Sequence, residues 1–147
     1  MSSYRQILYH IVFRTKDSRP IIEEAHKDEL FRYIWGIIHN NHCTLYRING
    51  VEDHIHILSD LHPSVCLADY MKDIKAGSSL WIKKNVIFPR FSGWGEGYGA
   101  FTVGYREKDM IINYIKKQQE HHKKVSFLEE YRSLLEEFGI VYNIQYI

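Results

Sequence analysis

The order of the periodic segments is the feature of this sequence that most constrains its fold. Segments rich in β-branched and aromatic residues, which are typical of strands, lie at residues 4–14, 43–48, 53–58 and 100–105. Segments with apolar residues at helical spacing fill the intervals at residues 23–40 and 65–84. The order strand, helix, strand, strand, helix, strand predicts a ferredoxin-like α+β sandwich (βαββαβ), in which an antiparallel sheet has both helices on one face.

Local signals add a turn and two more helices to this core. Asn49-Gly50 predicts the turn of a hairpin between the second and third strands. A tyrosine-bearing helix is predicted at residues 108–123, and it can lie across the other face of the sheet. Ser126 and Glu129 have the spacing of a capping box, so a C-terminal helix should begin there, and Gly139 is suited to end it.

Length and composition fit one folded domain. The 147 residues are 45% apolar, and they show neither a repeat nor a linker. We therefore expect a single domain over residues 1–147, with its core at 4–123 and a C-terminal helix and tail at 126–147. No stretch approaches the roughly 18 apolar residues of a membrane span, and the N-terminus lacks a signal-peptide pattern. Cys43 and Cys66 are far from any CxxC spacing, so we expect reduced, mostly buried thiols in a cytoplasmic protein.

Charge is unevenly distributed along the chain. The net charge of +1 does not by itself indicate nucleic-acid binding. Between residues 72 and 90, however, a single acid, Asp73, faces a set of basic residues: Lys72, Lys75, Lys83, Lys84 and Arg90. This segment is either a local basic patch or an ordinary solvated helix face.

Two histidines separated by one apolar residue lie in the third predicted strand. Side chains two apart on a strand point to the same face, so His54 and His56 project together while Ile55 and Ile57 face the opposite side, toward the core. Two adjacent imidazoles on a rigid strand form most of a metal site. The alternative is a pair of surface histidines on an amphipathic strand.

A tyrosine and a glutamine in the predicted helix 108–123 suggest the partner of that pair. Tyr114 and Gln118 are four residues apart and share a helix face, which His121 and His122 continue as candidates for supporting the site. His54, His56 and the Gln118 carbonyl would form a mixed nitrogen and oxygen ligand set with open positions, which suits Mg²⁺ or Mn²⁺. Tyr114 is then a candidate nucleophile toward a phosphodiester polarised by that ion. Alternatively, Tyr114 is one of eleven tyrosines and simply packs on its helix.

These motifs together resemble the histidine–hydrophobic–histidine (HUH) single-tyrosine transposases of the insertion-sequence-200-like family. The resemblance extends in order over nearly the whole chain, and it rests on the segments Tyr9–Lys16, Asp53–His56, Gly97–Val103, Tyr114–His122 and Ser126–Tyr131. A histidine pair alone is weakly specific. The pair combined with a downstream tyrosine, glutamine and two histidines is strongly specific.

The resemblance implies a mechanism and a set of partners. The enzyme would bind single-stranded DNA beside a hairpin, and an ion held by His54, His56 and Gln118 would polarise the scissile phosphate. Tyr114 would attack, leaving a 5′-phosphotyrosine link and a free 3′-OH. The resemblance also implies a homodimer with composite active sites and a location in the prokaryotic cytoplasm.

The glycine-rich loop at residues 85–99 offers further candidates for DNA binding. Trp94 and Tyr98 present aromatic faces on which unpaired bases could stack, although anchoring of the loop in the core is an equal alternative. Lys72, Lys75 and Arg90 are candidates for phosphate contacts. The glycines precede a strand rather than link a strand to a helix, so no nucleotide cofactor is expected.

Two other functions remain open at this point. One is a hairpin-DNA-binding or domesticated regulatory module of the same fold that does not cleave. The other is a metal hydrolase that uses water, with Tyr114 structural. Only a tyrosine nucleophile would leave a covalent adduct with DNA.

Overall fold

Four antiparallel strands form the centre of the molecule in the computed structural model, which describes residues 2–147. Their order across the sheet is β2-β3-β1-β4, and their bounds are Leu8–Arg14 (β1), Leu45–Val51 (β2), His54–Asp60 (β3) and Gly99–Val103 (β4). The two central strands are therefore β1 and β3, which pair along their whole lengths. The predicted α+β fold with an antiparallel sheet is confirmed.

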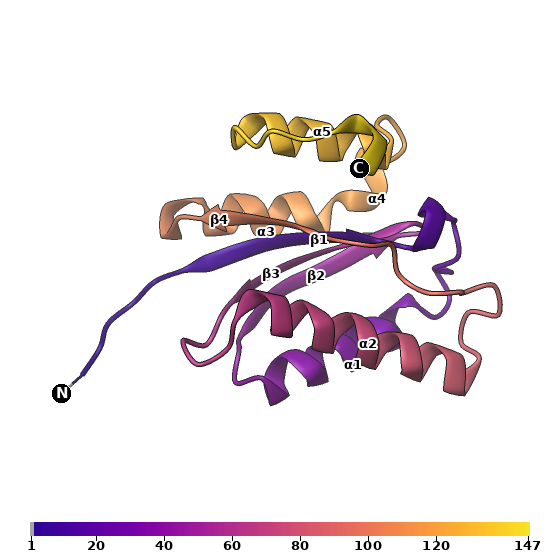
Figure 1. The fold of residues 1–147 in the computed structure, drawn as a ribbon, viewed down its shortest axis with the longest axis horizontal. Helices are drawn as coiled ribbons and strands as arrows, with labels where there is room; N and C mark the ends of the chain where they lie inside the picture. The colour runs from indigo at the N-terminus through magenta and orange to yellow at the C-terminus, as the bar shows by residue number, and fades with distance from the viewer. Residues whose placement is uncertain (1) are drawn as a thin grey trace.

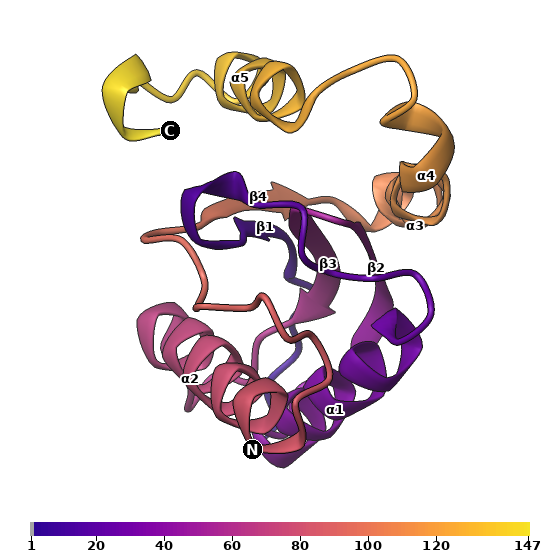
Figure 2. The same ribbon diagram turned by 90° about the vertical axis from the view of Figure 1, so that its right-hand side faces the viewer.

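Two helices cover one face of this sheet, α1 (Lys27–Asn40) and α2 (Leu67–Asn85), as Figures 1 and 2 show. The main core lies between them and the sheet. Ile11, Ile55 and Ile57 are fully buried in this core. Because side chains alternate along a strand, the burial of Ile55 and Ile57 here sends the histidines between and before them to the opposite face.

The opposite face is covered by three helices from the end of the chain, α3 (Lys108–Lys116), α4 (Gln118–His121) and α5 (Phe127–Glu137) (Figure 2). Ile115 of α3 packs in a small apolar cluster with Leu58 of β3. A separate apolar cluster joins α5 to Val12 of β1. The two faces of β1 and β3 are therefore both buried, one in the core and one beneath the C-terminal helices.

The predicted helix over residues 108–123 is wrong in one respect, because it is broken at Lys117, whose φ and ψ of −96° and 19° are not helical. The cause is a side chain from β2. The Asn49 amide donates hydrogen bonds to the carbonyl oxygens of Ile115 (2.8 Å) and Lys116 (3.2 Å), the oxygens that a continuing helix would offer to its next turn. Gln119 reinforces the junction with a hydrogen bond to the Asn49 side-chain oxygen at 2.9 Å.

The hairpin turn also differs from the prediction. Asn49 and Gly50 lie inside β2, and the turn falls at Glu52 and Asp53. The Asn49 side chain is 7% exposed and serves to dock the helices rather than to turn the chain.

Other local predictions agree with the structure. The capping box at Ser126 and Glu129 begins α5. Gly139, with φ of +66°, follows that helix in the left-handed conformation that glycine favours. Both cysteines are free thiols, but Cys66 is exposed rather than buried. Among residues 2–147, no helix is both long and apolar enough to cross a membrane.

Candidate active site

The two histidines of β3 point away from the core into a buried polar cluster between the sheet and α5. His54 and His56 are both fully buried. The Nδ1 atom of His54 lies 2.6 Å from the Asp53 carboxylate, and the Nδ1 atom of His56 lies 2.8 Å from Nε2 of His10 on β1. With each Nδ1 atom engaged by a neighbour, both Nε2 atoms face the centre of the cluster.

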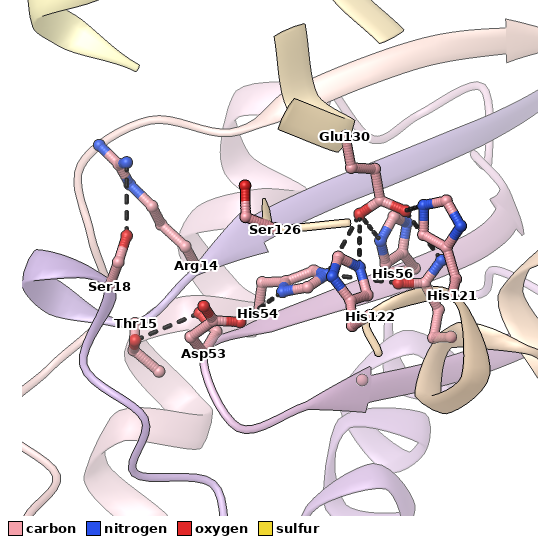
Figure 3. Close-up of polar contacts among 12 residues, drawn as sticks. Arg14, Thr15, Ser18, Asp53, His54, His56, His121, His122, Ser126 and Glu130 are labelled. Carbon is pink, nitrogen blue, oxygen red and sulfur yellow. Dashed lines mark hydrogen bonds and ion pairs between the residues drawn. The ribbon is translucent and has the colours of Figure 1, made fainter. Parts of the chain in front are cut away.

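Glu130 of α5 occupies the centre of this cluster (Figure 3). Its Oε1 atom lies 3.2 Å from Nε2 of His54 and 2.9 Å from Nε2 of His56. A third imidazole, that of His122, places its Nε2 atom 3.0 Å from the same oxygen. One carboxylate oxygen is thus surrounded by three histidine nitrogens from two separate parts of the chain.

The other carboxylate oxygen of Glu130 binds the predicted nucleophile. The Tyr114 hydroxyl donates a hydrogen bond to Oε2, and the Gln118 side-chain amide donates another at 3.0 Å. His121 Nε2 lies 3.3 Å from Oε2 without hydrogen-bond geometry. Tyr114 and Gln118 therefore donate to the same carboxylate oxygen, although they belong to two different helices.

The ionisation of the cluster follows from burial and from these contacts. Burial alone would raise the pKa of Glu130, but hydrogen bonds from His122 and the two strand histidines outweigh it and hold that pKa far below its ordinary value. Burial would lower the pKa of His54, but Asp53 and Glu130 raise it to about 9. Burial lowers the pKa of His56. Of the two strand histidines beside the ionised carboxylate, His54 is therefore protonated and His56 is neutral.

Burial, together with the charge of the adjacent Glu130, raises the pKa of Tyr114 above its ordinary value. The phenol is therefore neutral in this arrangement. Its ring lies edge-on to those of His10 and His56, with centroids 6.0 Å and 5.8 Å apart. The tyrosine is held beside the histidine pair of its own chain.

The donor chemistry of the cluster fits a divalent metal ion. Ligand atoms of His54, His56, His122 and Glu130 all lie within 4.8 Å of one another. Imidazole nitrogens with a carboxylate oxygen form a mixed donor set that suits first-row divalent ions such as Mn²⁺. Gln118 Oε1 lies 3.3 Å from His54 Nε2, at the edge of the same cluster.

The structure thus brings together all of the predicted chemical residues and adds two that the sequence reasoning missed, His10 and Glu130. Glu130 had a visible signal. In α5 the residues at helical spacing from Phe127 to Leu134 form an apolar face, and Glu130 falls on that face. An acid at a buried helix position requires partners, which the histidines provide. His10 gave a weaker signal as a polar residue within the apolar run of the first strand.

Comparison with known proteins agrees with this geometry. A family model described as "Transposase IS200 like" matches residues 3–118, well over half of the chain. This chain belongs to the IS200-like transposase family. The match ends at Gln118, so α5 and its Glu130 lie beyond the segment that defines the family in this comparison.

Individual members of the IS200-like family are similar over most of the chain. The transposase for insertion sequence element IS200 of Salmonella typhimurium is 30% identical over 125 residues, which cover 78% of both chains. The ISDra2 transposase TnpA of Deinococcus radiodurans is 22% identical over 122 residues, covering 78% of this chain and 86% of that protein.

Two solved structures share the fold. A proposed transposase from Deinococcus radiodurans R1 has a TM-score of 0.62 and 22% identity, covering 80% of this chain and 95% of that one. A REP-associated tyrosine transposase bound to a REP hairpin has a TM-score of 0.64 and 13% identity, covering 100% of this chain and 92% of that one. At these identities the likeness establishes the fold.

The residues predicted to bind DNA in this IS200-like family member differ in what they contact. Lys75 donates hydrogen bonds to the carbonyl oxygens of Gly95 (2.8 Å) and Gly97 (2.6 Å), so it holds the loop that precedes β4. The Trp94 indole donates to the Ser78 hydroxyl at 2.9 Å and is partly buried. The three other candidates are on the surface: Lys72, Arg90 and Tyr98.

Proposed function

We propose that this IS200-like family member is a metal-dependent transposase that cleaves and rejoins single-stranded DNA through a 5′-phosphotyrosine intermediate on Tyr114. The observation that supports this most strongly is the hydrogen bond of the Tyr114 hydroxyl to Glu130, the same carboxylate that contacts His54 and His56. The Glu130 side chain thus contacts both the proposed nucleophile, Tyr114, and the two proposed histidine ligands. Phosphoryl transfer depends mostly on such positioning and on charge stabilisation.

The reaction balances without any further reactant. The phenolic oxygen of Tyr114 bonds to phosphorus, the bond from phosphorus to the 3′ oxygen breaks, and the phenol's proton is matched by the one that the released 3′-OH gains. The energy of the phosphodiester is kept in the phosphotyrosine, so attack by another 3′-OH can reverse the bond without ATP. The role of the protein is to hold the phenol in line with the scissile phosphate.

His54, His56 and Gln118 are proposed as ligands of the ion, Mg²⁺ or Mn²⁺. When bound, the ion supplies positive charge to the oxygens of the scissile phosphate. Two imidazoles in the set favour Mn²⁺ over Mg²⁺. His121 and His122 are proposed to support these groups, since both approach Glu130.

A hairpin-bearing single strand is the proposed substrate. The structural neighbour with a TM-score of 0.64 is described as bound to a REP hairpin, which supports a hairpin for this chain as well. Lys72 and Arg90 are exposed and are proposed to meet phosphates, while Tyr98 offers a partly exposed ring to a base. Lys75 and Trp94 also make hydrogen bonds that hold the loop before β4 against α2.

The number of chains in the active form is a separate question. The family resemblance implies a homodimer in which the tyrosine helix of one subunit serves the histidines of the other. Here Tyr114 contacts Glu130 and lies beside His56 of its own chain, so one chain has a complete set of groups. We therefore propose that chemistry can occur in cis, whether or not the protein dimerises in the prokaryotic cytoplasm where it is expected.

The test is a search for the covalent adduct. Purified protein is incubated with Mn²⁺ and labelled hairpin-bearing single-stranded DNA, run on a denaturing gel, and any shifted band is mapped by mass spectrometry. We expect an adduct on Tyr114. Tyr114→Phe should abolish it and leave DNA binding intact, whereas Tyr105→Phe, at an exposed tyrosine, should behave as the wild type. Retained DNA without any adduct would instead support the non-cleaving hairpin-binding module.

A further inference from the structure

We infer that Glu130 supplies a carboxylate ligand to the metal ion, with His122 as a third imidazole beside the strand pair, so that helix α5 is part of the catalytic centre. This inference rests on the proposed function, because it concerns the ion of the same site. It assigns a role to a helix that lies after residue 118, where the family match ends.

The distances from the Glu130 carboxylate to the three imidazoles are close to those between ligands of one ion. Glu130 Oε1 lies 3.2, 2.9 and 3.0 Å from the Nε2 atoms of His54, His56 and His122. Ligands bound to one ion at about 2.1 Å in tetrahedral geometry lie about 3.4 Å apart. Each distance from Glu130 Oε1 to an imidazole is therefore within about half an ångström of that spacing, and all four ligand atoms lie within 4.8 Å of one another.

The partners of Glu130 also distinguish a ligand from an ordinary buried acid. The residue is 3% exposed, so its carboxylate requires compensation. Within residues 2–147, every ion-pair contact of Glu130 is to a histidine, and none is to lysine or arginine. Histidine is the commonest metal ligand in its neutral form, whereas a structural anchor would more simply use a permanent charge.

The second carboxylate oxygen fixes the direction of the first. Hydrogen bonds from Tyr114 and from the Gln118 amide, the latter at 3.0 Å, hold Oε2 and so aim Oε1 at the three imidazoles. Groups that orient ligands in this way are typical of metal centres. Gln118 therefore also positions the carboxylate, in addition to its proposed role as a ligand. The Glu130 side chain in turn links the proposed ion site to Tyr114.

The alternative to a ligand role is that the Glu130 carboxylate occupies the position of the ion and must move away before a metal can bind. The two readings predict opposite changes when the charge is removed. A ligand carboxylate strengthens metal binding, so its loss weakens affinity. A competing carboxylate weakens metal binding, so its loss tightens affinity.

Calorimetric titration with Mn²⁺ tests the inference on the full chain. Glu130→Gln should bind Mn²⁺ about tenfold more weakly or worse than wild type, since even the loss of a group that only orients a ligand costs about 10–100-fold. Glu137→Gln, an exposed acid on the same helix, is the matched control and should keep wild-type affinity. Wild-type or tighter Mn²⁺ affinity in folded Glu130→Gln would overturn the inference.

A second variant keeps the charge in case the first does not fold. Glu130→Asp shortens the side chain by one methylene, so the carboxylate no longer reaches the three imidazoles and Mn²⁺ binding should again weaken. Wild-type affinity in this variant would also refute the inference. The proposed function fails separately, by absence of a Tyr114 adduct in the wild-type protein, whatever the Mn²⁺ affinities are.

Discussion

Replacement of His10 tests whether the metal site depends on a residue that cannot itself reach the ion. His10 is 2% exposed, and its Nε2 atom lies 2.8 Å from Nδ1 of His56. For Nε2 of His56 to ligate, its proton must sit on Nδ1 and be donated to His10. Burial and the neighbouring His56 lower the pKa of His10 to about 3, so at neutral pH it is uncharged and able to accept. His10 is therefore a positioning residue for His56.

We expect His10→Ala to weaken Mn²⁺ binding about 10–100-fold, or about 1.4–2.7 kcal/mol, which is the usual effect of losing a group that orients a ligand. The same change leaves Nδ1 of His56 unpaired in a buried site, at a cost of about 1–3 kcal/mol of folding stability. Calorimetry with Mn²⁺ and urea unfolding measure the two effects separately.

Rescue distinguishes positioning from simple packing. His10→Gln keeps an acceptor oxygen near His56 and should recover much of the Mn²⁺ affinity, whereas His10→Leu fills the space without an acceptor and should not. His39→Ala, at an exposed histidine of α1, controls for the loss of an imidazole elsewhere. Wild-type Mn²⁺ affinity in folded His10→Ala would refute the reasoning.

Three further expectations follow from other contacts. Gly99→Ala would place a Cβ 2.6 Å from the Tyr131 ring of α5, so we expect a loss of about 1–3 kcal/mol in urea unfolding; unchanged stability would contradict the packing. Lys75→Met removes two hydrogen bonds to the loop before β4, so amide exchange at residues 95–99 should quicken, and unaltered exchange would contradict that role. In the metal-free protein, the raised pKa of His54 should add roughly 3 kcal/mol to the folding stability below pH 6.5, and this contribution is lost as the pH rises through about 9. The lowered pKa of His10 has the opposite effect, because it reduces the folding stability as the pH falls from 6.5 toward 3. A urea midpoint measured in EDTA should therefore peak near pH 6.5, and a steady rise up to pH 9 would count against these shifts.

The sheet could be predicted from the sequence because its signals are local. Alternation at residues 53–58 fixed which side chains of β3 face the core, and the structure agrees. The break at Lys117 could not be predicted, because it depends on the Asn49 amide 66 and 67 residues before the carbonyls that it binds. The Asn49-Gly50 pair has the composition of a turn, but the tertiary contact of the asparagine prevailed over its local preference.

The site residues on the strand could be placed from local sequence signals, whereas those on the helices could not. The histidine pair is built on a central strand whose register is held on both sides, so its placement follows from the strand alone. Glu130 and Tyr114 come from helices whose docking depends on tertiary packing, such as the contact of Gly99 with Tyr131. If α5 provides a ligand, an alanine at Gly99 should weaken Mn²⁺ binding as well as folding, although that glycine contacts no group of the site. If the strand histidines suffice for the ion, the same substitution would lower stability and leave Mn²⁺ affinity unchanged.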